Sequence, residues 1–297
     1  MTNNAFHSLC IAALLFAGGA AHAARTIHET HEAGPRATVD INGVSGTFDV
    51  SGWDKPSVEV FGTVGADVER VDVSGDSNHV SVQVVTRTGR LWGTDGNAHL
   101  SVRVPAAASV STTVVSADLH TTGLSGEVEL HTVSGNITGE VGGNLRAKTV
   151  SGEVRLKAPV ARSLRISTVS GDVQASGGDG ESDVTTVSGS ADLTLGTQSR
   201  AHFKSVSGDF TVALGLAPDG QVDGEAVSGN VKLNVHGAAA ADYDVETHSG
   251  SIHNCFGPKP EEPRYGPGSR LMFKNGDSSA RVHVVTHSGD VRLCKSE

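Results

Sequence analysis

Hydrophobic and polar positions alternate along most of the chain, and the alternation restarts at a short phrase, Thr-Val-Ser-Gly or a close variant. Steps of 17 to 21 residues separate the first seven glycines of this phrase, and 39 residues separate the last two. These glycines are Gly135, Gly152, Gly171, Gly189, Gly208, Gly229, Gly250 and Gly289. A fixed period near twenty residues is typical of a solenoid, in which each repeat is one coil of the chain.

Apolar residues stand at fixed offsets from each glycine. Two and four residues after Gly152 come Val154 and Leu156, and Leu164 and Ile166 open the next repeat. A period of two predicts strands that bury one face. The valine two before each glycine is expected to point inward as well. It is out of phase with the apolar residues seven and five before the glycine. We therefore expect a corner or bulge near the Thr to skip one residue.

One coil is therefore predicted to contain a strand, a corner at Thr-Val-Ser-Gly, a second strand and a variable turn. The fold class that follows is all-β, a single-chain β-solenoid (β-helix-like) with coils of 17–21 residues. Residues 111–297 carry the regular repeats. Residues 24–110 alternate with less regular spacing, and we expect them to form an N-terminal β cap with the first rungs. Roughly nine or ten coils are expected in all.

The first 23 residues have the features of a signal peptide. Leu9 to Ala21 is an apolar run, and Ala21-His22-Ala23 has the small-residue pattern of a cleavage site. The run is too short for a membrane-spanning helix, and the mature chain offers no other. The sequence therefore predicts export to the periplasm, the cell surface or the medium.

Composition narrows the choice of partner. The net charge is −10 and aromatic residues make up 4% of the chain. An acidic chain lacks the Lys/Arg patches that supply affinity for nucleic acid, so no nucleic-acid partner is expected.

The Gly52-Trp53-Asp54-Lys55-Pro56 turn, the alternating strands after it and the Val104-Pro105 boundary add a further pattern. With the series of Val-Ser-Gly-Asp/Glu/Asn-Val repeats, they resemble the bacterial putative-adhesin domain family, a domain of unknown function. The resemblance covers nearly all of the mature chain. It implies an exported β-solenoid with an adhesin role, and it supplies no catalytic residues.

The C-terminal end departs from the regular array. Cys255 and Cys294 each lie five residues after a motif glycine, and they are the only cysteines after the signal peptide. In an exported chain this predicts a disulfide between adjacent coils, because coils two apart are too distant to bridge. The 39-residue gap is then one coil with an insertion, the proline-rich loop at 257–268. Such loops commonly carry function, so Arg264 and Tyr265 within it are candidate binding residues.

His248 and His287 take the place of the motif valine in the last two repeats. Stacked histidines could bind a metal or respond to pH. The favoured interpretation is two half-buried imidazoles near an open solenoid end, because no further ligand stands at a recognisable spacing. Neither a metal nor a cofactor is predicted. The stretch Gly177–Asp183 is interpreted as a plain turn and not as a calcium-binding repeat.

Two classes of function remain. Acidic residues recur one position after the motif glycine, namely Glu153, Asp172, Asp209 and Asp290. A polysaccharide-cleaving β-helix enzyme would need two such carboxylates in a cleft. Residues that recur on a convex face are typical of solubilising positions, so the favoured function is non-enzymatic. The chain is expected to bind an envelope protein or a surface glycan, as an adhesin or scaffold. A chaperone-like role is not separable from this one by sequence.

Overall fold

The computed structural model describes residues 24–87, 97–262 and 267–296. All regular structure in these residues is β-strand, which confirms the all-β solenoid. The strands are β1 (Arg25–Glu32), β2 (Thr38–Asn42), β3 (Ser45–Trp53), β4 (Ser57–Val64), β5 (Val68–Gly75), β6 (His79–Thr86), β7 (Asn97–Pro105), β8 (Ser109–Thr113), β9 (Ser116–Leu124), β10 (Val128–Ser134), β11 (Ile137–Val141), β12 (Leu145–Ser151), β13 (Val154–Ala158), β14 (Ser163–Ser170), β15 (Val173–Gly177), β16 (Gly180–Ser188), β17 (Ala191–Ser207), β18 (Phe210–Ser228), β19 (Val231–His236), β20 (Ala241–Ser249), β21 (Ile252–Asn254), β22 (Ser269–Asn275), β23 (Arg281–Ser288) and β24 (Val291–Ser296).

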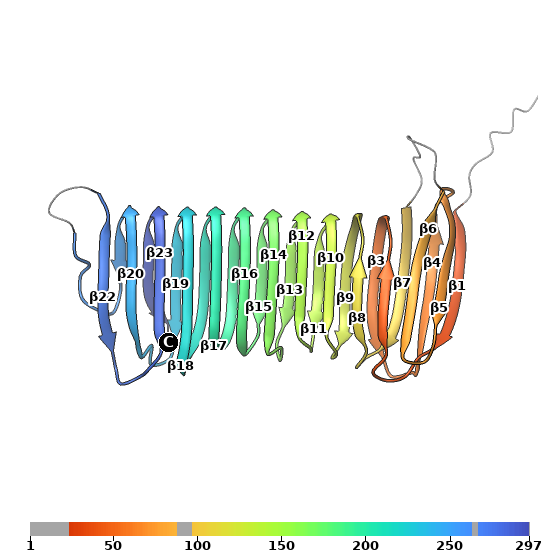
Figure 1. Cartoon of the computed structure of the whole chain (residues 1–297), viewed down its shortest axis with the longest axis horizontal. Helices are drawn as coiled ribbons and strands as arrows, with labels where there is room; N and C mark the ends of the chain where they lie inside the picture. The colour runs from red at the N-terminus through yellow and green to blue at the C-terminus, as the bar shows by residue number, and fades with distance from the viewer. Residues whose placement is uncertain (1–23, 88–96, 263–266, 297) are drawn as a thin grey trace, which may run out of the picture.

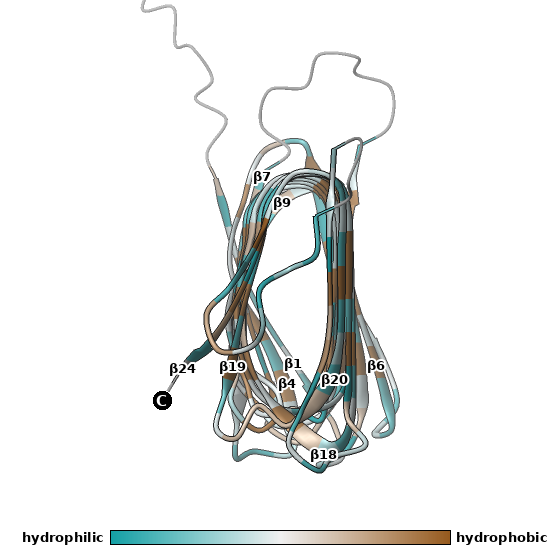
Figure 2. Ribbon diagram, turned by 90° about the vertical axis from the view of Figure 1, so that its left-hand side faces the viewer, coloured by the Kyte–Doolittle hydropathy of each residue, from teal (hydrophilic) through white to brown (hydrophobic). Residues whose placement is uncertain are grey.

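The strands stack side by side into a rod with two faces (Figure 1). Figure 2 looks along the rod and shows its flattened cross-section. Face A, read along the stack, holds β5, β6, β2, β8, β10, β12, β14, β16, the second halves of β17 and β18, then β23, β20 and β22. Face B holds β1, β4, β7, β3, β9, β11, β13, β15, the first halves of β17 and β18, then β19, β24 and β21. One coil is a strand of face A followed by a strand of face B.

Both ends of the stack depart from chain order. At the start, β2 lies between β6 and β8, and β3 lies between β7 and β9. At the other end, β23 lies between β18 and β20, and β24 lies between β19 and β21. The first coil in sequence is therefore second in space, and the last in sequence is penultimate. Eleven coils form in the described residues, more than the nine or ten expected, because residues before 111 contribute complete coils.

The core is one continuous layer of side chains between the two faces. Each regular coil buries the residues seven, five and three before its glycine and those two and four after it. In the coil of Gly152 these are Leu145, Ala147, Thr149, Val154 and Leu156.

The inward orientation expected for the motif valine is wrong. Val150 is 47% exposed, and its equivalents along the stack are similarly exposed. Every second residue is buried up to Thr149, and the chain then passes from face A to face B. Val, Ser and Gly lie on the outside of that bend. The alternation of inward and outward side chains therefore shifts by one residue after the Thr and not before it.

The glycine of the phrase is required for two reasons. Gly208 has a φ of 141°, a conformation that side chains with a Cβ rarely adopt. A Cβ there would also overlap the carbonyl oxygen of Gly189 in the neighbouring coil. The same contact links Gly289 to Gly229, and Gly250 to Gly289, so the glycine row follows the spatial order of the coils.

Both ends of the rod are closed by antiparallel strands. At the N-terminal end β5 pairs with β6, and β4 pairs with β7 and β1. At the C-terminal end β22 pairs with β20, and Phe273 of β22 stacks on Tyr243 at 4.8 Å between ring centroids. Phe256 meets both rings edge-on. Burial raises the pKa of the Tyr243 hydroxyl, which donates to the Ala239 carbonyl oxygen at 2.8 Å. Three aromatic rings therefore cover the end of the core.

We expect Gly208→Ala to lower the free energy of unfolding by about 3 kcal/mol or more, because φ strain adds to the overlap with Gly189. Gly237→Ala is the matched control, since Gly237 also has a positive φ, 74°, but nothing lies within 4 Å of an added Cβ. Its expected cost is about 1 kcal/mol. Urea denaturation measures both, and equal losses in the two variants would contradict the close approach of the coils.

Candidate functional site

A trough lies on the outer surface of face B. It has a volume of about 550 Å3 and crosses β9, β11, β13, β15 and β17 at right angles to the strands. Its floor is the main chain at Gly139, Leu156 and Ala175. The side chains of Leu156 and Ala175 turn into the core. Two rows of outward side chains form the walls: His120, Arg155, Gln174 and Asp192 on one side, and Thr122, Glu140, Lys157, Ser176 and Thr194 on the other.

The walls of the trough carry donors and acceptors in register. The Arg155 guanidinium forms an ion pair with Glu153, and His120 Nδ1 lies 3.0 Å from Thr138 Oγ1. Lys157 is exposed between Glu140 and Ser176 of the adjacent strands. Each coil thus presents one polar side chain on either wall about every 4.8 Å. Such an arrangement can hold an extended polar chain that lies along the rod.

The corner between the faces presents three further rows: the valines, the serines that follow them, and the Asp, Asn or Glu one position after the glycine. The third row is structural. Asp209 Oδ1 accepts from the Asn230 main-chain N at 2.7 Å, and Asn230 Oδ1 accepts from Asp290 N at 3.0 Å. Asp172 accepts in the same way from Ser190 N at 2.8 Å. Asp172 and Asp209, two of the acids that suggested a catalytic alternative, are therefore bound to the main chain of the next coil.

Asp290 ends this row. Its carboxylate accepts from the main-chain N of Ser251 at 2.8 Å and from the Ser251 hydroxyl at 2.9 Å. These two bonds, the main-chain one first, lower the pKa of the Asp290 carboxyl. Through Asp290, the row thus connects the outermost coil, formed by β20 and β21, to the coil of β23 and β24.

His248 and His287 lie side by side, with ring centroids 5.4 Å apart. They are exposed at the corner, because the valine that they replace is exposed; the half-buried setting expected for them is therefore wrong. His248 Nε2 is 3.7 Å from Glu246 Oε1. In the part of the chain that the structure describes, no group of three His, Cys, Asp or Glu side chains could hold a metal ion.

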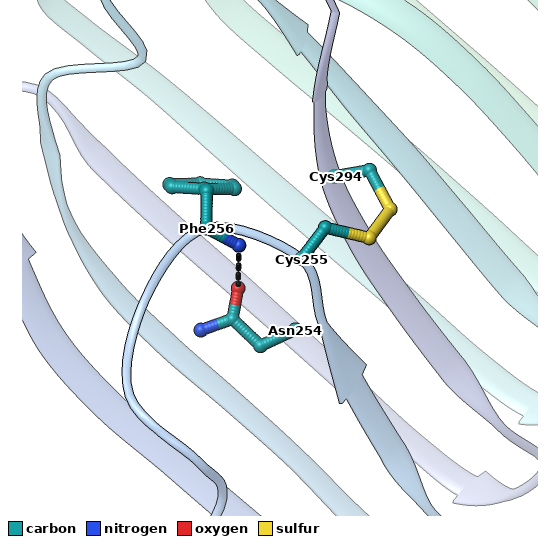
Figure 3. The surroundings of a disulfide bond; sticks show 4 residues. All are labelled: Asn254, Cys255, Phe256 and Cys294. Carbon is teal, nitrogen blue, oxygen red and sulfur yellow. Dashed lines mark hydrogen bonds between the residues drawn. A yellow bond between two sulfur atoms is a disulfide. The ribbon is translucent and has the colours of Figure 1, made fainter.

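Cys255 and Cys294 form a disulfide on the outer side of face B, with Cα atoms 4.8 Å apart (Figure 3). Cys255 directly follows β21, and Cys294 lies on β24, the adjacent strand. The gap before the last motif glycine holds more than the proline-rich loop, because β22 follows it and pairs with β20. The candidate binding residues Arg264 and Tyr265 lie outside the described residues, as does the predicted signal peptide of residues 1–23.

A cluster at the N-terminal end of face B escaped the sequence analysis. The Arg103 guanidinium lies 4.7 Å from the centroid of the Phe61 ring and 5.9 Å from that of Trp53. Glu59 accepts from His28 and Arg103, each at 3.0 Å. These bonds, that of His28 first, lower the pKa of the Glu59 carboxyl. The alternation of β4 and β7 places these residues outward, but only their antiparallel register brings Glu59 beside Arg103.

The chain belongs to the Toastrack DUF4097 family, which matches residues 63–294, and the resemblance to putative-adhesin domains is confirmed. No protein with a curated description matches the chain. In the described residues, no helix has the length and apolar character needed to cross a membrane.

Three solved structures match this chain over most of its length. A putative adhesin from Bacteroides fragilis is 11% identical, with a TM-score of 0.43, over 91% of this chain and 97% of that chain. A putative cell adhesion protein from Clostridium sporogenes is 9% identical, with a TM-score of 0.24, over 92% and 100%. A putative lipid binding protein from Parabacteroides distasonis is 12% identical, with a TM-score of 0.34, over 91% and 97%.

Asp290→Asn should flatten the acid limb of the stability profile. Because the folded pKa of this carboxyl lies below its ordinary 3.8, its contribution is present above about pH 4 and is lost as pH falls through the folded value. Urea midpoints from pH 6 to pH 2.5 measure the effect. Asp277→Asn, at an exposed position after β22, is the control. Identical profiles for wild type and Asp290→Asn would contradict the role of this carboxylate.

Reduction of the disulfide, or the Cys255→Ser/Cys294→Ser variant, should loosen the C-terminal end by about 2–4 kcal/mol, because the bridge closes a long loop. Amide hydrogen exchange is the measurement, with faster exchange expected in β21 and in the residues that follow it. Strands β12 and β13 in the middle of the rod serve as the internal control. Unchanged exchange in β21 would show that pairing with β24 alone holds this coil.

Proposed function

We propose that this chain is an exported, non-enzymatic β-solenoid of the cell envelope that binds an envelope protein or a surface glycan, as an adhesin or scaffold. The resemblance to putative-adhesin domains, carried by the Val-Ser-Gly repeats, supports an interaction role of this kind. The predicted signal peptide and a disulfide, which persists in oxidising compartments, support export to the periplasm or cell surface.

The face-B trough is the observation that carries the proposal. It offers a rigid row of hydrogen-bonding side chains over five neighbouring strands, a length of about 19 Å at the spacing of stacked strands. Binding surfaces on solenoids extend in this way across repeats. Arg155 and Lys157 lie near its middle on one strand, so an acidic or hydroxyl-rich polymer is the class of partner that it fits.

The geometry of the acids favours binding over cleavage. The trough contains Glu140 on β11 and Asp192 on β17, which are three strands apart. That separation is about 14 Å, whereas the paired carboxylates of glycosidases lie within about 9.5 Å. The acids of the corner row, such as Asp209, are occupied by the main chain of the next coil.

A binding assay with isolated envelope polysaccharides and envelope protein fractions tests the proposal. We expect saturable binding by the purified protein, no shortened sugars in the same mixtures, and at least tenfold weaker binding by Arg155→Glu/Lys157→Glu. Arg165→Glu/Arg200→Glu is the matched control, because it makes the same charge change at exposed positions of face A. Shortened sugars would overturn the non-enzymatic assignment, and absence of saturable binding would overturn the binding role.

A further inference from the structure

An apolar row runs along the corner of the rod. Eight motif valines are 40–50% exposed, and we name this row the valine ridge: Val44, Val115, Val133, Val150, Val169, Val187, Val206 and Val227. The serines that follow these valines pair in register from coil to coil, so the valines also form one straight row. His287 and His248 continue it over the last two coils. An exposed, contiguous apolar surface of this length marks an interaction site.

The rows beside the ridge differ in chemistry. On the face-B side lies the row of motif serines, and beyond it the row that contains Glu153 and Asp209. On the face-A side, beyond the buried Thr, lies a row of mixed charge. It contains the exposed Lys148 and Lys204, and Lys204 Nζ pairs with Glu225 of the same row at 2.8 Å. In the coils of Lys148 and Lys204, a cross-section of the corner therefore reads basic, apolar, small polar, acidic.

We propose that the valine ridge is the contact surface of a homodimer in which two copies pack corner to corner with their rods parallel. A two-fold axis along the rod exchanges the sides of the corner while each coil stays opposite the same coil. The valines of one copy then lie over the serines of the other, and large residues pack into a row of small ones. Lys204 of one copy faces Asp209 of the other, and Lys148 faces Glu153.

A second copy fits this surface because it has the same repeat. Strands stack at about 4.8 Å in both copies, so eight valines stay in step with eight serines along the whole ridge. A partner without this repeat would fall out of step after a few coils. A two-fold axis across the rod would place valine over valine and Asp209 near other acids, which like-charge repulsion disfavours.

The size of the contact suits a reversible dimer. Ten coil positions, the two histidines included, span about 43 Å, and a corner about 15 Å wide then gives about 1,300 Å2 in total for two copies. That value is at the lower end of specific interfaces, so we expect association in the micromolar range.

Sedimentation velocity of the purified protein from about 1 to 300 μM, a range that brackets micromolar association, tests the proposal. We expect a concentration-dependent dimer in wild type and at least tenfold weaker association in Val169→Asp/Val187→Asp. The control is Val160→Asp/Met272→Asp, which adds the same charge at hydrophobic residues that are 68% and 63% exposed away from the ridge. Thermal unfolding checks that the ridge variant still folds.

Zero-length carbodiimide cross-linking of mixed light and heavy isotope-labelled protein gives a readout that does not depend on substitution. We expect cross-links between Lys204 of one label and Asp209 of the other, at concentrations where the dimer forms. A monomer at every concentration would overturn the proposal, as would a dimer that resists the ridge variant. Mixed-label cross-links that join opposite ends of the rod would overturn the parallel arrangement.

Discussion

Hydrogen bonding from one coil to the next is the interaction on which the rest of this structure depends. Each strand finds its main-chain partners in the coils above and below, and a single coil could satisfy neither its donors nor its apolar side chains. Because every coil must meet its neighbours at the same spacing, equivalent residues line up into rows. The buried Thr row, the glycine row and the row of Asp and Asn all result from this constraint.

Within these rows, common residue types have specific structural roles. A glycine is needed at the corner because the next coil approaches so closely that no side chain fits between Gly208 and Gly189. An aspartate one position later, such as Asp209, binds the main chain of the coil above it. The hydrogen bonds of this row connect each coil to the next.

An open sheet edge exposes unpaired main-chain donors and acceptors, and the chain is rearranged at both ends of the rod to cover them. Both terminal coils in sequence are inserted one place inward, and antiparallel strands cover the outermost positions. At the C-terminal end, the stacked rings of Tyr243 and Phe273 close the core, and the disulfide ties the outermost coil to the coil that was inserted. The middle of the rod, by contrast, is regular, and its binding surfaces come from rows and not from loops.

The periodic sequence by itself determined the fold class, the coil length and the apolar core positions on the strands, because a period of two with a repeat near twenty leaves few other solutions. It also indicated that Cys255 and Cys294 occupy equivalent positions. Three features were decided only by tertiary structure. The order of the coils follows from strand pairing between distant segments, such as β18 with β23, which no local pattern encodes. The outward direction of Val150 depends on where the chain bends between the faces. The trough brings His120 and Asp192 to one wall although they are far apart in sequence, because wall positions are defined by register and not by chain order.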